Sequence, residues 1–94
     1  MKTKYRVTFW RHIPTMIAAS GEGREVKAEM PNRFMEAVDS YAMAVGLTGT
    51  EEYVAQWKKG PWLEREGAPE EVIKAAMAEL EAQFKVIEIP QRNL

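Results

Sequence analysis

Cysteine is absent from this sequence, and histidine occurs only once, as His12. A chain without thiols forms no disulfide, holds no thiolate metal site and has no cysteine nucleophile. A zinc site would need imidazole or carboxylate ligands, and only one imidazole is present. We therefore expect no metal site and no cofactor.

An excess of charge of one sign is also absent. The 13 Lys and Arg residues are balanced by 14 Asp and Glu residues, which gives a net charge of −1. Proteins that bind DNA or RNA usually carry a basic excess. Nucleic acid is therefore not the partner that this composition predicts.

Long apolar runs are missing as well. No segment approaches the ~18–20 apolar residues that cross a membrane. The start, Met1-Lys2-Thr3-Lys4, leads into an alternating strand pattern and not into the apolar core of a signal peptide. This pattern predicts a cytoplasmic protein without a membrane partner.

The composition that remains is that of a folded domain. Hydrophobic residues make up 46% of the chain and charged residues 29%, which are ordinary globular values. A chain of 94 residues has enough apolar surface for one core and no more. We expect a single domain over residues 1–94, with its core at about residues 4–89.

Alternating polarity predicts strands in the N-terminal third. The odd-numbered residues from Tyr5 to Phe9 are apolar, and Ile13, Ile17 and Ala19 continue that phase. Pro14 has no N–H, so it predicts one long strand bent at Ile13-Pro14 or two strands that meet there. The turn residues 20–23 and the alternation after them predict a returning strand and a hairpin.

Helical spacing predicts the next two elements. Apolar side chains recur every three or four positions over residues 34–45, and Gly46 suits a left-handed C-terminal cap. A second, short helix is expected to begin at a hydroxyl cap, Thr48 or Thr50. It is expected to stop near Gly60-Pro61.

The C-terminal third predicts the longest helix and a final strand. Pro69 and the two acids after it are typical of a helix start, and an apolar row follows as far as Phe84. Residues 85–89 have strand character and end at Pro90; they could add a third strand beside the first.

The predicted fold class is α+β: an antiparallel β-hairpin or three-stranded sheet with three α-helices packed on one face. The residues expected to build that face are Val7, Phe9, Val26, Phe34, Val38, Tyr41, Val45, Val72, Ala76, Leu80 and Phe84.

Trp10 and Arg11 are the first candidates for a binding role, because Trp and Arg are enriched in interface hot spots. Trp10 lies in the phase opposite to the expected core. It is either an exposed anchor or a member of a second small core under Trp57 or Trp62. Arg11 either turns outward at a bulge or is buried against a carboxylate such as Glu64 or Glu66.

Two further motifs have simpler explanations than catalysis or nucleic-acid binding. His12 could act as a general base, but no nucleophile or second histidine lies beside it in the sequence, which favours a surface or turn residue. Residues 57–62, Trp-Lys-Lys-Gly-Pro-Trp, have the ingredients of single-strand stacking. Two lysines that offset the dipole at a helix end explain the pair more simply, and the acids from Glu64 onward would repel phosphate.

Several motifs occur in an order typical of one family. They are Phe9-Trp10-Arg11-His12-Ile13-Pro14, Pro31-Asn32-Arg33-Phe34 running to Val38-Asp39, Ala42-Met43 through Gly46-Leu47-Thr48-Gly49-Thr50, Tyr53, Trp57, and Glu64-Arg65-Glu66-Gly67. Over roughly residues 5–84 the chain resembles the small bacterial "virulence factor" domain, which also occurs in conserved virulence factor C. The family pattern has an acidic residue after Trp-Arg, where this chain has His12.

The resemblance implies a cytoplasmic bacterial protein and supplies no established catalytic residue. In some relatives the domain is joined to HEAT-like repeats, an architecture used for protein contacts. The family name records a phenotype and not a mechanism.

We therefore expect a non-catalytic binding or accessory module that acts through contacts with a protein partner or a second copy. Whether it is an enzyme stays open, although no catalytic set is visible. The expected contact residues are Trp10, Arg11, His12, Trp57, Trp62 and Arg65. The alternative is a ligand-binding or enzyme subunit whose pocket is completed by a homodimer or partner chain, with Trp10, His12, Tyr53 and Trp57 as pocket residues.

Overall fold

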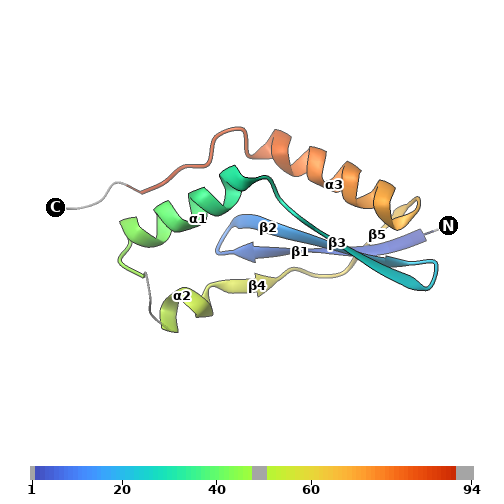
Figure 1. The fold of residues 1–94 in the computed structure, drawn as a ribbon, viewed down its shortest axis with the longest axis horizontal. Helices are drawn as coiled ribbons and strands as arrows, with labels where there is room; N and C mark the ends of the chain where they lie inside the picture. The colour runs from blue at the N-terminus through green and yellow to red at the C-terminus, as the bar shows by residue number, and fades with distance from the viewer. Residues whose placement is uncertain (1, 48–50, 91–94) are drawn as a thin grey trace.

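The computed structural model describes residues 2–47 and 51–90 (Figure 1). Within these ranges the chain forms an antiparallel sheet with helices, which confirms the α+β class. The elements in chain order are β1 (Lys2–Trp10), β2 (Ile13–Gly21), β3 (Arg24–Glu29), α1 (Asn32–Ala44), α2 (Glu51–Ala55), β4 (Trp57–Lys59), β5 (Leu63–Glu66) and α3 (Pro69–Gln83).

Strand β1 lies at the centre of the sheet. It pairs with β2 on one edge, and β2 in turn pairs with β3. The other edge of β1 is shared by two short strands, because β5 pairs with Lys2–Tyr5 and β4 with Thr8–Trp10. The described residues therefore form a five-stranded sheet, larger than the predicted hairpin or three-stranded sheet.

Two predictions for the C-terminal half were wrong because neither included the short strands β4 and β5. Residues 85–89, predicted as a strand, are irregular, and β4 and β5 occupy the edge of β1 where that strand was placed. The second helix ends at Ala55 and not near Gly60, because the chain at Trp57 turns to pair with β1. Strands of three or four residues are too short for their own periodicity to reveal them.

The turns explain how Pro14 is accommodated. The chain reverses at Arg11 and His12, where Arg11 adopts a φ of 53°, so two strands meet just before the proline. The pairing register shifts between Thr8 and Phe9, which leaves Thr15 as an extra residue in β2. The Thr15 hydroxyl donates a hydrogen bond to the Thr8 carbonyl oxygen over 3.0 Å, which fixes this bulge.

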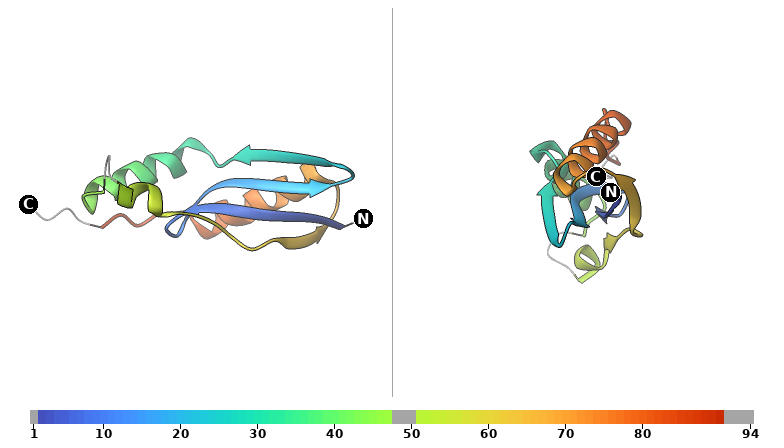
Figure 2. Two further views of the ribbon diagram at one scale, coloured as in Figure 1. Left: turned by 90° about the horizontal axis from the view of Figure 1, so that it is seen from below. Right: turned by 90° about the vertical axis from the view of Figure 1, so that its right-hand side faces the viewer.

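The helices divide between the two sides of the sheet. Helices α1 and α3 lie on one side, and α2 lies on the other, next to the tip of the first hairpin (Figure 2). The prediction of three helices on one face was therefore wrong for α2. None of the helices in the described ranges is long and apolar enough to span a bilayer.

The predicted helix boundaries are largely confirmed. Gly46 has a φ of 74°, and the Leu47 N–H donates to the Ala42 carbonyl oxygen over 2.8 Å, as expected of a left-handed cap. Helix α3 begins at Pro69 with Glu70 and Glu71 in its first turn. The predicted caps Thr48 and Thr50 lie outside the described residues.

The core fills the space between the sheet and helices α1 and α3. Of the residues predicted for this face, Val7, Phe34, Val38, Val72 and Ala76 are buried, and the rest are partly buried. Buried residues that the prediction of that face did not include are Trp10, Ile13, Ile17, Ala19, Met30, Ala42 and Ile73.

Replacing Phe34 with Ala should lower the free energy of unfolding by about 3–5 kcal/mol, because the ring is fully buried and its loss leaves a cavity. Urea denaturation followed by far-UV circular dichroism measures the change. Val86→Ala is the control, since Val86 is 78% exposed and its truncation should cost less than about 0.5 kcal/mol. Equal effects of the two variants would contradict this core.

Candidate functional site

The six predicted contact residues occupy three separate places in the fold. Trp10, Arg11, His12 and Trp57 lie at or beside the tip of the first hairpin. Trp62 lies on the sheet face opposite α1 and α3, whereas Arg65 contacts α3 on the helix side. They do not form one surface.

Trp10 is fully buried, which removes it from any exposed contact surface. Its ring packs against Tyr41 of α1 and Tyr53 of α2, with 5.6 Å between ring centroids in both pairs. The indole N–H donates to the Tyr53 carbonyl oxygen over 3.0 Å. Trp10 is therefore packed and not an exposed anchor, but it belongs to the main hydrophobic core and not to a second small one. Its ring neighbours are two tyrosines, and Trp57 is paired beside it in β4.

The rest of this tip is aromatic and partly buried. Trp57 is half-buried and lies 6.4 Å from Tyr53, between ring centroids. Burial raises the pKa of the Tyr53 phenol, and the Asp39 carboxylate raises it further, so the phenol is protonated at neutral pH. These rings stabilise the hairpin tip between α1 and α2.

Arg11 is exposed at the turn. Its backbone N–H donates to the Gln56 carbonyl oxygen over 3.0 Å, and its guanidinium carbon lies 5.3 Å from the centroid of the Tyr41 ring. The predicted partners Glu64 and Glu66 lie beside the opposite end of β1. The structure thus excludes the buried-pair alternative for Arg11 and supports the outward one.

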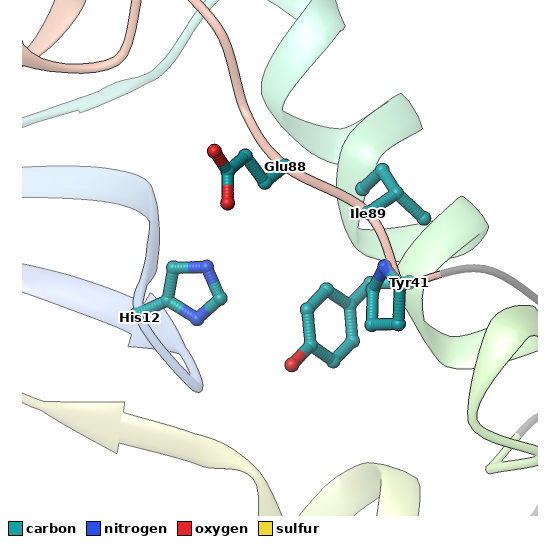
Figure 3. Close-up of a pocket in the computed structure, with 5 residues that line it drawn as sticks. His12, Tyr41, Glu88 and Ile89 are labelled. Carbon is teal, nitrogen blue, oxygen red and sulfur yellow. The ribbon is translucent and has the colours of Figure 1, made fainter.

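His12 lines a hollow of about 250 Å³ together with Tyr41, Glu88, Ile89 and Pro90. The imidazole lies edge-on to the Tyr41 ring at 5.5 Å, and the Glu88 carboxylate projects into the same space (Figure 3). No group of three or more His, Asp or Glu side chains in residues 2–47 and 51–90 could hold a metal ion. The hollow offers one imidazole, one phenol and one carboxylate.

The second candidate site is the sheet face that α1 and α3 leave open. Because side chains alternate along a strand, Lys4, Arg6 and Thr8 of β1 share this face. The register places one residue of β2 and one of β3 beside each of them. The resulting rows are Lys4–Ser20–Glu25, Arg6–Ala18–Lys27 and Thr8–Met16–Glu29.

This face is hollowed along its middle because β2 contributes small side chains there. A hollow of about 150 Å³ is lined by Arg6, Thr8, Met16, Ala18, Glu25, Lys27, Lys59 and Trp62. We call this set the open-face trough. A second hollow of about 360 Å³ adjoins it through Thr8 and Met16 and extends to Met35 and Trp57.

Trp62 borders the open-face trough and is held there by β1. Its side chain is 45% exposed, and the Arg6 guanidinium carbon lies 4.4 Å from its ring centroid, a cation–π contact. The Gly60 N–H donates to the Val7 carbonyl oxygen over 2.7 Å and anchors the segment before Trp62. A Cβ at Gly60 would lie 3.0 Å from that oxygen, so any larger residue would force the neighbouring backbone to shift by a few tenths of an ångström.

The charges of the open-face trough are unevenly paired. Lys27 forms an ion pair with Glu25 at 3.5 Å. Arg6 and Lys59 form no ion pair with any residue in the described part of the chain, and neither does the adjacent Lys4. Within the described residues, the open-face trough thus presents two cations, Arg6 and Lys59, that have no ion-pair partner.

Arg65 has a structural role on the other side of the sheet. Its guanidinium lies 2.7 Å from a Glu79 carboxylate oxygen of α3 and 5.5 Å from the Tyr5 ring centroid. The hydrogen bond from Arg65 lowers the pKa of Glu79. Arg65 therefore connects β5 to α3 and does not share a surface with Trp62.

Sequence reasoning missed Arg6, Ala18 and Lys27, and it assigned Lys59 to a helix end although it lies in β4. The alternation that predicted the apolar phase also defined a polar phase, and that signal could have identified Arg6, Ala18 and Lys27. Lys59 joins them only because β4 pairs with β1 beside Thr8, which no local pattern indicates.

The three tryptophans should differ in their access to a neutral quencher. Trp62→Phe should remove most of the fluorescence that acrylamide quenches, because Trp62 is the exposed indole. Trp10→Phe should leave that fraction intact and lower stability by about 1–3 kcal/mol, since the Tyr53 carbonyl loses its donor. Stern–Volmer titration and urea denaturation test both. A strongly quenched Trp10 would contradict the buried placement.

The Arg65–Glu79 pair should make stability depend on pH. Because the folded-state pKa of Glu79 is lowered, its contribution is present above the ordinary value near 4.5 and is lost as pH falls through the folded pKa. The stability difference between wild type and Arg65→Gln should therefore be larger at pH 7 than at pH 3. Lys74→Gln, at an exposed position of α3, is the control and should show no such trend.

A family model described as "Virulence factor" matches residues 8–91. No curated protein and no solved structure matches the chain. The matched segment includes the first hairpin tip and begins at Thr8, so Lys4 and Arg6 of the open face lie outside it.

Proposed function

The chain belongs to the virulence factor family, and for this member we propose a non-catalytic binding module that acts through protein contacts. The observation that carries the proposal is the open-face trough. One face of the sheet is left without a helix over most of its length. It combines the exposed Trp62 with Arg6 and Lys59, which have no ion-pair partner among the described residues.

The chemistry of this face suits a protein partner. Tryptophan and arginine are the residues that most often dominate binding energy at protein interfaces, and here Trp62 and Arg6 are in contact. The hollows are small, at about 150 and 360 Å³, and each is lined by side chains from several neighbouring strands. Cations and carboxylates alternate across the rows, which favours specific recognition of a partner.

A second candidate is a ligand-binding subunit that uses the hollow at the hairpin tip. The observation in its favour is that His12 and Glu88 face the same space beside Tyr41 (Figure 3). An imidazole and a carboxylate in one hollow can exchange a proton with a bound molecule. Either role would be carried out in the cytoplasm, the location expected from the sequence.

Filling the open-face trough should abolish binding. Ala18→Tyr places a bulky side chain in the middle of the trough, at a strand position that tolerates tyrosine. We expect a stoichiometric protein, captured from the native host by tagged wild type and identified by mass spectrometry, to be lost with this variant. Ala78→Tyr, the same change at an exposed position of α3, should retain it.

Circular dichroism must show that both variants fold. Retention of the partner by Ala18→Tyr would contradict binding through this face. Loss of the partner on His12→Ala alone would instead favour the hairpin tip.

A further inference from the structure

We propose that the open-face trough binds an extended acidic segment of the partner, with carboxylates at alternate positions along its chain. This inference rests on the proposed function and specifies the chemistry of the ligand. Three observations support it: the distribution of charge over the fold, the spacing of the cations, and the cation–π contact between Arg6 and Trp62.

Charge in this molecule is divided between helices and strands. Within the described residues, the helices carry eight acidic and two basic side chains, whereas the strands carry eight basic and four acidic ones. The near-zero net charge of the whole chain conceals this separation. Of these strand charges, the register places five basic side chains (Lys2, Lys4, Arg6, Lys27 and Lys59) and four acidic ones (Glu25, Glu29, Glu64 and Glu66) on the open face. The row Arg6–Ala18–Lys27 holds two cations and no carboxylate, which favours an acidic ligand at that row.

The cations on this face follow one another at the repeat of an extended chain. Lys4 and Arg6 are two residues apart in β1, which is about 6.8 Å along the strand. Lys59 is paired with Thr8, the next residue of β1 on the same face, so it supplies the cation of the following row. An extended peptide has the same two-residue repeat, and one carboxylate at every second position would meet one cation per row.

The centre of the trough leaves room for such a segment. Ala18 and Ser20 of β2 are small, so a peptide backbone can lie over them between the β1 and β3 side chains. Trp62 borders this space, and Arg6 stacks on its ring at 4.4 Å. The guanidinium is thereby oriented, and its free N–H groups can donate to a carboxylate.

A nucleic-acid backbone suits the face less well. Glu25 and Glu29 of β3 and Glu64 of β5 belong to the same rows as the cations and would repel a continuous line of phosphates. One face of the Trp62 ring is already covered by Arg6, which limits base stacking.

The test uses two fluorescein-labelled octapeptides of identical composition, one with Glu and Thr alternating and one with four Thr followed by four Glu. Fluorescence anisotropy with the full chain at 50 mM salt measures both affinities. We expect the alternating peptide to bind about fivefold more tightly or better, because only it aligns a carboxylate with each row. Equal affinities of the two peptides would overturn the proposed alignment of one carboxylate with each row.

Neighbouring lysines supply a matched pair of variants. Lys59→Gln should weaken the alternating peptide about threefold, whereas Lys58→Gln, which removes the same charge in the opposite strand phase, should not. Arg6→Gln should weaken it at least as much as Lys59→Gln. Equal effects of Lys58→Gln and Lys59→Gln would show a response to net charge only and would overturn the proposal.

Two further outcomes separate this inference from the proposed function. If Ala18→Tyr abolishes capture of the native partner while the two peptides bind alike, the protein-binding role stands and the acidic segment is wrong. If a labelled eight-nucleotide oligothymidine binds more tightly than the alternating peptide and depends on Lys59, the ligand class is wrong. If the native partner is unaffected by Ala18→Tyr, the proposed function itself fails.

Discussion

The pairing of β1 along both of its edges is the constraint on which the rest of the structure depends. Its backbone is paired with β2 on one side and with β5 and then β4 on the other. This arrangement places Trp10 under α2 and brings the segment containing Trp62 to Arg6. The open-face trough is thus built on β1, and the hollow at the hairpin tip on the turn that follows β1; segments distant in sequence complete both.

The two sides of the sheet have separate chemical roles. The side under α1 and α3 is apolar and contributes the burial that stabilises the domain. The other side keeps its charged and small residues in contact with solvent, apart from the part that α2 covers. Alternation along one strand places neighbouring residues on opposite sides of the sheet. Arg6 therefore lines the open-face trough, while Val7 is buried in the core.

Local patterns in the sequence were sufficient for the long elements and insufficient for the short ones. The hairpin at residues 20–23, the Gly46 cap and the start of α3 at Pro69 each follow from a few adjacent residues. The strands β4 and β5 exist only through their pairing with β1, so their sequences carry no sufficient signal of their own. For the same reason the sequence alone leaves Trp10 open as an exposed anchor or a packed residue. It also assigns Trp62 and Arg65 to one contact surface, although the sheet separates them.

The late position of β4 and β5 in the chain has a consequence for folding kinetics. The first two hairpins join neighbouring segments and need only short loops to close. Thr8 and Lys59 are about fifty residues apart, so their pairing carries a larger loop-closure entropy and contributes to a high contact order. The first 47 residues supply Arg6 but neither Trp62 nor Lys59. The open-face trough is therefore complete only after the pairings that close the longest loops have formed.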